Sequence, residues 1–393
     1  MGIAIPQVIT PSKASGAQVI DGSLKFDESR DNYLERTPGS AGDRRTWTWS
    51  CWVKKTQSEG FSDDGVLFEA RIDSPGSTDA NIFGIRWRTN GRIIVYDTGN
   101  SYIGGTREFR DLSAFYHLVL SVDTTQASNN ISLYVNGDLY LQGTYTQNTD
   151  TRVNDTCAHR IGARTTLGGQ DAHFLDSTLA QTYFIDGQAL GPEYFGFTDP
   201  LTNTWKPKKV SVTGPNDGTT WSTSTYLSST TNYSGYPIEN GFDGNPESQW
   251  LENTQGGTVT FSNISLAYSS SIKIKVGGTG ATVSVNGGAG QSIGAASWVS
   301  VASGSGTLTS LAWSANGSEY PALYGIKIDD VMLFDGDTTN FGVNGFYLPM
   351  DGNSPIGQDK SGRGNNWTPV NFGGSVALDN PIVSGARPIL NTT

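Results

Sequence analysis

Hydrophobic and polar residues alternate along most of this chain in short runs. The sharpest alternation lies in residues 45–55, RTWTWSCWVKK, where Trp47, Trp49, Cys51 and Val53 fall on one face of an extended segment. A period of two is the signature of a β-strand with one face turned toward a core. Similar runs span residues 65–71, 81–98, 115–123, 131–145, 158–164 and 177–187. We therefore predict a chain built from many short strands.

Asn-Gly pairs separate several of these runs. They stand at Asn90-Gly91, Asn136-Gly137 and Asn286-Gly287, each between apolar strand patterns. This dipeptide favours tight hairpins because both residues tolerate positive φ. Long stretches rich in Ala, Leu, Glu and Lys are missing, so helices should be few. Short strands joined by tight turns predict an all-β fold, an antiparallel β-sandwich.

The character of the sequence changes near residue 210 and returns near residue 340. Residues 211–337 are richer in Ser, Thr and Gly and poorer in Arg than the flanking parts. Within them, strand patterns span residues 257–268, 271–278, 281–290, 297–304, 307–317 and 324–336. We predict a second β-sandwich inserted into the first. The first then comprises residues 19–210 plus 338–372, with terminal arms at 1–18 and 373–393.

The first sandwich carries recognisable segments. These are NYLERTPGSAGDRRTWTWSCWVKK, FYHLVLSVD, ISLYVNGDLY, YFIDGQALGPEYFG, WKPKK, NGFYLPM and DKSGRGNNWTP. In this order they are similar to the concanavalin A-like lectin/laminin-G superfamily, in the version found in structural proteins of marine bacteriophages. The resemblance implies a jelly-roll sandwich over residues 19–210 and 340–372. It does not imply a particular ligand, because one fold serves many functions.

The inserted region resembles a galactose-binding-like, discoidin-type jelly roll. The resemblance rests on GFDGNPESQW near its start and LYGIKIDDVML near its end. It implies a structural Ca²⁺ held by oxygen ligands of Asp243 and Asn245. The family usually adds a Glu from its last strand, but this chain has Lys327 there, which opposes a cation. Alternatively, Asp243 and Asn245 stabilise a turn by Asx-type hydrogen bonds. No other cofactor is expected.

Candidate catalytic groups are scarce. The lectin-like sandwich is shared with glucanases, which place carboxylates at two-residue spacing on one strand face, but no Glu-x-Asp-x-x-Glu run occurs. A Gly-x-Ser-x-Gly spacing occurs at residues 290–294, GQSIG, but we expect no nucleophile elbow of the hydrolase type. We expect His117, in the strand pattern FYHLVLSVD, to be a structural core histidine, and neither His159 nor His173 has a partner at metal-ligand spacing. We predict that the protein is not an enzyme.

Composition narrows the partners and the compartment. The formal net charge is −11 over 393 residues, which argues against nucleic-acid binding, since that requires clustered Lys and Arg. No apolar run approaches the roughly 20 residues of a membrane span. The N-terminal segment lacks the basic leader of a signal peptide. Cys51 and Cys157 are expected in strands as reduced core residues, although a single bridge stays open.

Exposed aromatic rings beside polar side chains are the usual means of sugar recognition. The most aromatic loop-like stretch is 221–250, which offers Trp221, Tyr233, Tyr236 and Trp250 beside Asn232. We predict that these residues bind glycans. The alternative is that the rings fill the ends of the inserted jelly roll.

The terminal arms contain prolines and few charges, so we expect them to grip neighbouring subunits in an assembly. Together these features predict a bacteriophage virion protein, a fibre, tail or capsid appendage, forming homo-oligomers. It would be assembled in the bacterial cytoplasm, exposed after lysis, and would contact host surface glycans non-covalently. One alternative is a purely architectural decoration or adaptor protein that binds only other virion proteins. A third is a secreted glycan-binding module.

Overall fold

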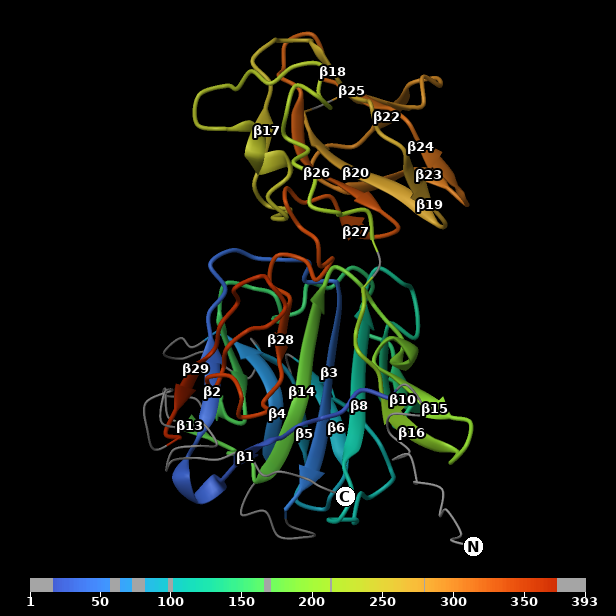
Figure 1. Cartoon of the computed structure of the whole chain (residues 1–393). Helices are drawn as coiled ribbons and strands as arrows, with labels where there is room; N and C mark the ends of the chain where they lie inside the picture. The colour runs from blue at the N-terminus through green and yellow to red at the C-terminus, as the bar shows by residue number, and fades with distance from the viewer. Residues whose placement is uncertain are drawn as a thin grey trace, which may run out of the picture.

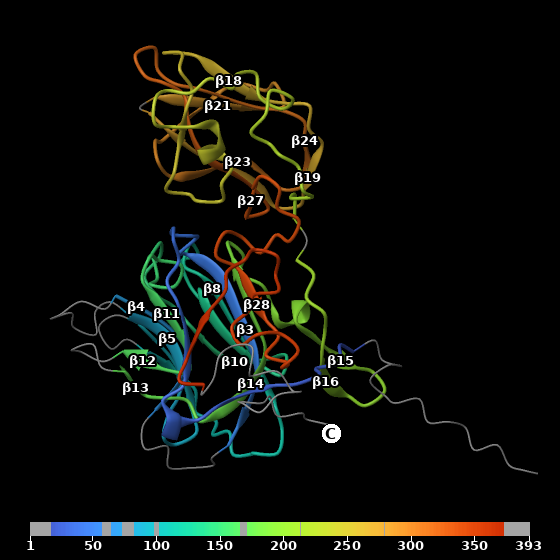
Figure 2. The same cartoon turned by 60° about the vertical axis from the view of Figure 1, so that its left-hand side comes forward.

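The structure of the protein is a computed structural model, which describes residues 17–56, 64–72, 82–97, 102–165, 171–212, 214–278 and 280–372. Nearly all regular structure in these ranges is β-strand, which confirms the all-β prediction. The short 3-10 turns are η1 (Glu28–Arg30), η4 (Pro192–Tyr194) and η5 (Ile238–Gly241). Figures 1 and 2 show two lobes, one above the other, joined by narrow connections.

The first lobe is a sandwich of antiparallel sheets. One sheet has the order β1 (Leu24–Phe26), β14 (Ser177–Asp186), β3 (Thr46–Lys55), β8 (Tyr116–Asp123), β9 (Ile131–Val135) and β10 (Asp138–Gly143). The other has the order β29 (Thr368–Val370), β2 (Tyr33–Arg36), β11 (Ala158–Ile161), β4 (Gly65–Arg71), β5 (Ile82–Trp87), β6 (Ile93–Asp97) and β7 (Tyr102–Gly104). Short hairpins accompany them: β12 (Arg164–Thr165) with β13 (Asp171–Ala172), and β15 (Gly196–Asp199) with β16 (Thr204–Pro207).

Strands from the end of the chain complete both sheets of the first lobe. β28 (Phe346–Leu348) pairs with β14, and β29 pairs with β2. In Figure 1 these late strands, coloured red, lie among the blue and green strands of the first part of the chain. Phe346 is buried and packs edge-on against Trp367, with ring centroids 5.0 Å apart. The C-terminal segment is therefore part of the first core.

Strand β3 shows why the alternation predicted the core. Trp47, Trp49, Cys51 and Val53 are all fully buried in the core of the first lobe. The opposite face of β3 is also covered, by the segment that follows β14. The Thr48 hydroxyl donates to the Gln188 carbonyl at 2.7 Å. Cys51 and Cys157 are both buried free thiols.

The second lobe has its own sheets and its own core. One sheet runs β17 (Trp250–Leu251), β26 (Ala322–Ile328), β20 (Ser271–Gly277) and β23 (Trp298–Ser303), with β27 (Val331–Met332) beside β26. The facing sheet runs β18 (Thr258–Phe261), β25 (Leu311–Ser314), β21 (Ala281–Val285) and β22 (Gln291–Ile293). β19 (Leu266–Tyr268) pairs with β24 (Gly306–Leu308). The core residues come from positions 221–333, separate from those of the first lobe.

The lobes meet at a buried ion pair. Lys327 of β26 contacts Asp43, which precedes β3 in the first lobe. Burial acts to raise the pKa of Asp43, but the Lys327 ammonium and the backbone N–H groups of Arg45 and Thr46 together outweigh it, and the pKa lies below its usual value. The ends of the insertion also touch each other, because Asn216 N donates to Asn340 Oδ1 at 3.2 Å.

Two sequence predictions lie largely outside the described residues. These are the terminal arms, of which only residues 17 and 18 are described. Gln18 N donates to the Pro207 carbonyl at 2.9 Å, beside the β15–β16 hairpin. Among the described residues, no helix is long and apolar enough to cross a membrane.

Candidate functional site

The two tryptophans predicted to bind glycans are core residues. Trp221 is 4% exposed and Trp250 is 0% exposed. Trp250 packs edge-on against Trp313 at 6.1 Å, and its Nε1 donates to the Thr231 carbonyl at 3.1 Å. A ring without an exposed face cannot stack on a sugar. The prediction was therefore wrong for Trp221 and Trp250, and the alternative, that they fill the jelly roll, describes them.

The tyrosines of the same stretch do reach the surface. Tyr233 is 41% exposed and Tyr236 is 37% exposed, and Asn232 beside them is also exposed. Their loop is held to β17 by the backbone, because Tyr233 N donates to the Leu251 carbonyl at 2.8 Å. Tyr236 N donates to the Tyr233 carbonyl at 3.0 Å, which closes a turn between the two rings. The loop therefore presents these side chains from a fixed backbone.

A hollow of about 330 Å³ lies next to this loop. Its lining residues are Gln249, Leu251, Gly277, Gly278, Ala295, Ala296, Ser318, Glu319, Tyr320, Ala322 and Tyr324. The Tyr233 ring flanks it, with its centroid 4.7 Å from that of Tyr320. We call the hollow, together with Tyr233 and Tyr236, the tyrosine hollow.

Glycine keeps the floor of the tyrosine hollow open. A Cβ at Gly277 would lie 2.8 Å from the Ala322 Cβ and 3.3 Å from the Tyr324 ring. Gly278 has a φ of +90°, a conformation that side-chain-bearing residues rarely adopt. The partly exposed rings of Tyr320 and Tyr324 line the hollow beside the amide of Gln249 and the carboxylate of Glu319.

Sequence reasoning missed Tyr320, Tyr324 and Glu319. Glu319 and Tyr320 directly precede β26 and Tyr324 lies within it, some 80 positions after the loop of Tyr233 and Tyr236. The pairing of β17 with β26 brings the two segments together, through Trp250 opposite Leu323. The sequence does show aromatic residues near position 320. That they lie close to the loop of Tyr233 and Tyr236 depends on the pairing of β17 with β26.

The residues predicted to hold calcium form a hydrogen-bonded turn. Asp243 Oδ1 accepts from Asn245 N at 2.8 Å, and Asp243 Oδ2 accepts from Ser248 Oγ at 2.6 Å. Asn245 Oδ1 accepts from Glu247 N at 3.0 Å. No group of three or more His, Cys, Asp or Glu side chains among the described residues is arranged to hold a metal ion. These contacts favour the Asx-turn alternative, and calcium binding at Asp243 stays a prediction.

Two buried histidines have structural partners. His117 Nδ1 accepts from Trp205 Nε1 at 3.0 Å, and its Nε2 lies 2.9 Å from Ser50 Oγ. Since Nδ1 accepts, the ring proton is on Nε2 and donates to Ser50. Burial lowers the pKa of His117 to about 3. His159 is similar, with burial lowering its pKa to about 4. The structural role predicted for His117 is confirmed.

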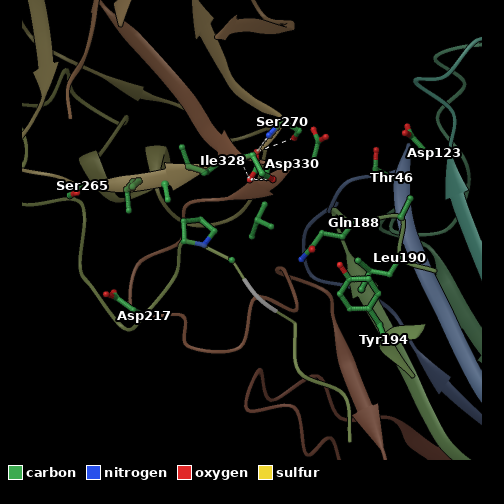
Figure 3. A pocket seen from close by; sticks show the side chains of 18 residues that line it. Thr46, Asp123, Gln188, Leu190, Tyr194, Asp217, Ser265, Ser270, Ile328 and Asp330 are labelled. Carbon is green, nitrogen blue, oxygen red and sulfur yellow. Dashed lines mark hydrogen bonds between the residues drawn. The ribbon is translucent and has the colours of Figure 1, made fainter. Parts of the chain in front are cut away.

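Clefts also lie between the lobes. One of them has a volume of about 690 Å³. In Figure 3, its first-lobe wall carries Gln188, Leu190 and Tyr194, and its second-lobe wall carries Ser270, Ile328 and Asp330. The neighbouring Asp329 carboxylate accepts from the backbone N–H groups of Ser269, Ser270 and Ser271, at 2.7 to 3.0 Å. Its oxygens hold the turn of Ser269, Ser270 and Ser271 at the start of β20, so this cleft offers no free acidic group at Asp329.

Comparison with known proteins supports the fold of the first lobe. Residues 28–189 match the family described as the concanavalin A-like lectin/glucanases superfamily. The matched residues contribute strands to both sheets of the first lobe, so the match agrees with the antiparallel sandwich found there. None of the curated proteins matches the chain.

Several solved structures are similar to part of the chain. A heptameric SAP-like pentraxin from Limulus polyphemus shares 16% identity, with a TM-score of 0.34, covering 44% of this chain and 80% of its own. A putative carbohydrate binding protein from Bacteroides ovatus shares 13% identity, with a TM-score of 0.32, covering 45% of this chain and 46% of its own. The CBM40 of a Ruminococcus gnavus IT-sialidase shares 14% identity, with a TM-score of 0.29, covering 40% of this chain and 89% of its own. These similarities are too low to assign a ligand to this chain.

Proposed function

We propose that this protein binds glycans non-covalently through the tyrosine hollow of its second lobe. The observation that carries the proposal is the convergence of Tyr233, Tyr320 and Tyr324 from two distant segments on one open hollow. Aromatic faces accept the C–H side of a sugar ring, and the polar groups of Gln249 and Glu319 can hydrogen-bond its hydroxyls. This combination suits a polyhydroxyl ligand better than a purely apolar one.

The biological setting that we propose is a bacteriophage particle. The protein would be a fibre, tail or capsid appendage that is assembled in the bacterial cytoplasm and meets host surface glycans after lysis. The segments that resemble phage structural proteins support this setting. The insertion would be a discoidin-type jelly roll, a proposal supported by its two facing sheets and the GFDGNPESQW loop. Insertion at the end of a scaffold leaves its loops free to vary.

A purely architectural role is the second candidate. It is favoured by the sequence of the terminal arms 1–18 and 373–393, whose prolines and few charges suit contacts with other virion proteins. The protein would act there as a homo-oligomer. In either role we propose that the protein has no hydrolase activity, since the sequence lacks the carboxylate pair of the glucanases. Turnover of a bound glycan that disappears when one Asp or Glu is changed would contradict this.

The experiment is a comparison of glycan-array binding and host-cell adsorption between the native protein and the variants Tyr236→Ala and Tyr320→Ala. A stacked ring contributes about 1 kcal/mol beyond area burial, so each change should weaken binding several-fold. Leu201→Ala is the control, because Leu201 is 79% exposed on the first lobe and is not among the residues that line the hollow. All variants should be matched for thermal stability.

Two outcomes would count against glycan binding at this hollow. Unchanged binding by both tyrosine variants would move the site elsewhere. Absence of binding to glycans and cells by the native protein, with firm binding to other virion proteins, would favour the architectural role.

A further inference from the structure

A second hollow, of about 810 Å³, lies where the first lobe meets the outer face of a second-lobe sheet. We call it the junction cleft. Residues 41–46 of the first lobe form one wall, and strands β20, β23 and β26 form the other. On these strands Lys275 is the register partner of both Trp298 and Gly325, and Lys273 is the partner of Lys327. Lysines and a tryptophan therefore share one surface of the sheet.

Trp298 lies along that surface. A Cβ at Gly325 would be 3.2 Å from Trp298 Cη2, so the indole extends from β23 across β20 toward β26. The Lys327 ammonium lies 4.8 Å from the centroid of the ring. Trp298 is only partly buried, and Ser297 and Ser300 beside it are exposed. A flat, accessible ring bordered by hydroxyl groups is a suitable platform for a sugar.

The cationic side chains of the cleft are compensated by acids. The pairs are Arg44 with Asp155 at 3.1 Å, Arg45 with Asp150 at 2.6 Å, Lys273 with Asp330 at 2.5 Å, Lys275 with Glu247 at 3.2 Å, and Lys327 with Asp43. An anionic ligand would have to displace one of these carboxylates. Hydroxyl groups can instead donate to the acids and accept from the bases without breaking a pair. The chemistry therefore favours an uncharged polyhydroxyl ligand.

The junction cleft adjoins the tyrosine hollow. Ala296 lines both of them. Lys275, on the wall of the cleft, has its ammonium 5.0 Å from the centroid of the Tyr324 ring, which lines the hollow. A ligand longer than one or two sugars that starts at the tyrosines would therefore extend toward Trp298.

We propose that the junction cleft is a second subsite for an uncharged oligosaccharide chain, whose other part lies in the tyrosine hollow. This inference rests on the proposed function of the hollow. It adds that the ligand is a chain of several sugars rather than a single terminal residue, and that both lobes contribute to its recognition. The ion pair between Lys327 and Asp43 holds the two walls of the subsite at a fixed separation.

The test uses the full-length protein and neutral glucose, galactose and mannose oligosaccharides of one to six units, with a galacturonic acid hexasaccharide as the charged probe. Calorimetry gives the affinities, and hydroxyl-radical footprinting locates the protected residues. We expect neutral hexasaccharides to bind more tightly than disaccharides and to protect residues 41–46 and Trp298. Trp298→Ala should reduce hexasaccharide affinity roughly fivefold, the equivalent of about one stacked ring, and leave disaccharide affinity unchanged.

The variant Trp298→Phe keeps an aromatic ring and should retain most of the chain-length effect, which separates stacking from a folding defect. Binding with the same chain-length dependence in Trp298→Ala as in the native protein would overturn the proposal. So would stronger binding of the galacturonic acid chain than of every neutral hexasaccharide. Disaccharide binding at the tyrosines without any gain from longer chains would refute the second subsite alone. Failure of every sugar to bind would refute the proposed function as well.

Discussion

His117 lies where the main sheet of the first lobe meets the β15–β16 hairpin. Its ring connects Ser50 of β3 with Trp205 of β16, and it stacks on Trp52 with centroids 4.8 Å apart. Both ring nitrogens are occupied by these partners, so the neutral ring fits and the charged ring would lose the bond from Trp205. Burial disfavours the charged ring, and this lowers the pKa of His117 far below its usual value.

Stability should therefore depend on pH at this residue. Between pH 6.5 and 3, His117 is protonated in the unfolded chain and neutral in the folded protein. The free energy of unfolding therefore falls as the pH drops. One such group contributes a slope of about 1.4 kcal/mol per pH unit. Urea unfolding at pH 5, 6 and 7 gives the free energy of unfolding at each pH. This free energy should change less steeply with pH in His117→Gln than in the native protein.

Other buried groups act in the same pH range and must be considered with His117. His159 has a lowered pKa and adds to the loss of stability in acid. Burial raises the pKa of Asp186 to about 6, so the folded state binds that proton more readily and partly offsets the loss between pH 6 and 4. If the free energy of unfolding depends on pH equally in His117→Gln and in the native protein, His117 does not cause that pH dependence.

At the scale of single elements, the conformation of the Asn-Gly hairpin turns depends on the turn residues themselves. Asn136 and Gly137, between β9 and β10, have φ angles of 52° and 87°. Asn286 and Gly287, after β21, have φ angles of 50° and 71°. Positive φ at both central positions gives a turn whose twist matches that of the strands, which is why Asn-Gly predicted these turns correctly.

Gly287→Ala tests this rule without a steric clash. No atom lies within 4 Å of the position a Cβ would occupy at Gly287, so the expected loss of about 1 kcal/mol comes from the backbone alone. Gly317→Ala in the same lobe is the control, since it also has free space and no positive φ, and it should be nearly neutral. Chemical denaturation of the two variants gives the comparison. Equal losses would show that φ at Gly287 is not the cause.

At the scale of the whole molecule, two separately built cores are joined by neighbouring chain connections and one buried ion pair. The connections run side by side, as Asn340 Nδ2 donates to the Val212 carbonyl at 3.4 Å. The ion pair between Lys327 and Asp43 links the two lobes directly. Its removal on one side would leave a buried charge without its partner, which is costly.

This arrangement predicts that the first lobe folds without the insertion. Replacing residues 211–337 by a short Gly/Ser joint should leave a cooperative β-sandwich, because the chain enters and leaves the insertion side by side and the main core of the first lobe takes its residues from outside the deleted segment. Circular dichroism and thermal unfolding are the measurements. The deletion also removes Lys327, the ion-pair partner of Asp43. A shortened chain that carries Asp43→Asn controls for the unpaired carboxylate. An unfolded product in both forms would contradict the domain boundaries.

The sequence by itself determined the strands, the sandwich class and the family resemblance of the first lobe. These depend on a period of two and on turn residues such as Asn136-Gly137, which are local properties. It also identified the loop of Tyr233 and Tyr236 and the structural histidine His117. Each of these features can be derived from residues close together in the chain.

Only the tertiary structure decided which aromatic rings face solvent. Trp221 and Trp250 have the same apolar character as Tyr233, yet they are buried because the two sheets of the second lobe close over them. The pairing of β17 with β26 brings Tyr320 and Tyr324 to the hollow, and the packing of the lobes directs Lys327 toward Asp43. Exposure and proximity between distant segments depend on how elements pack, and the alternation of residues within one strand carries no information about them.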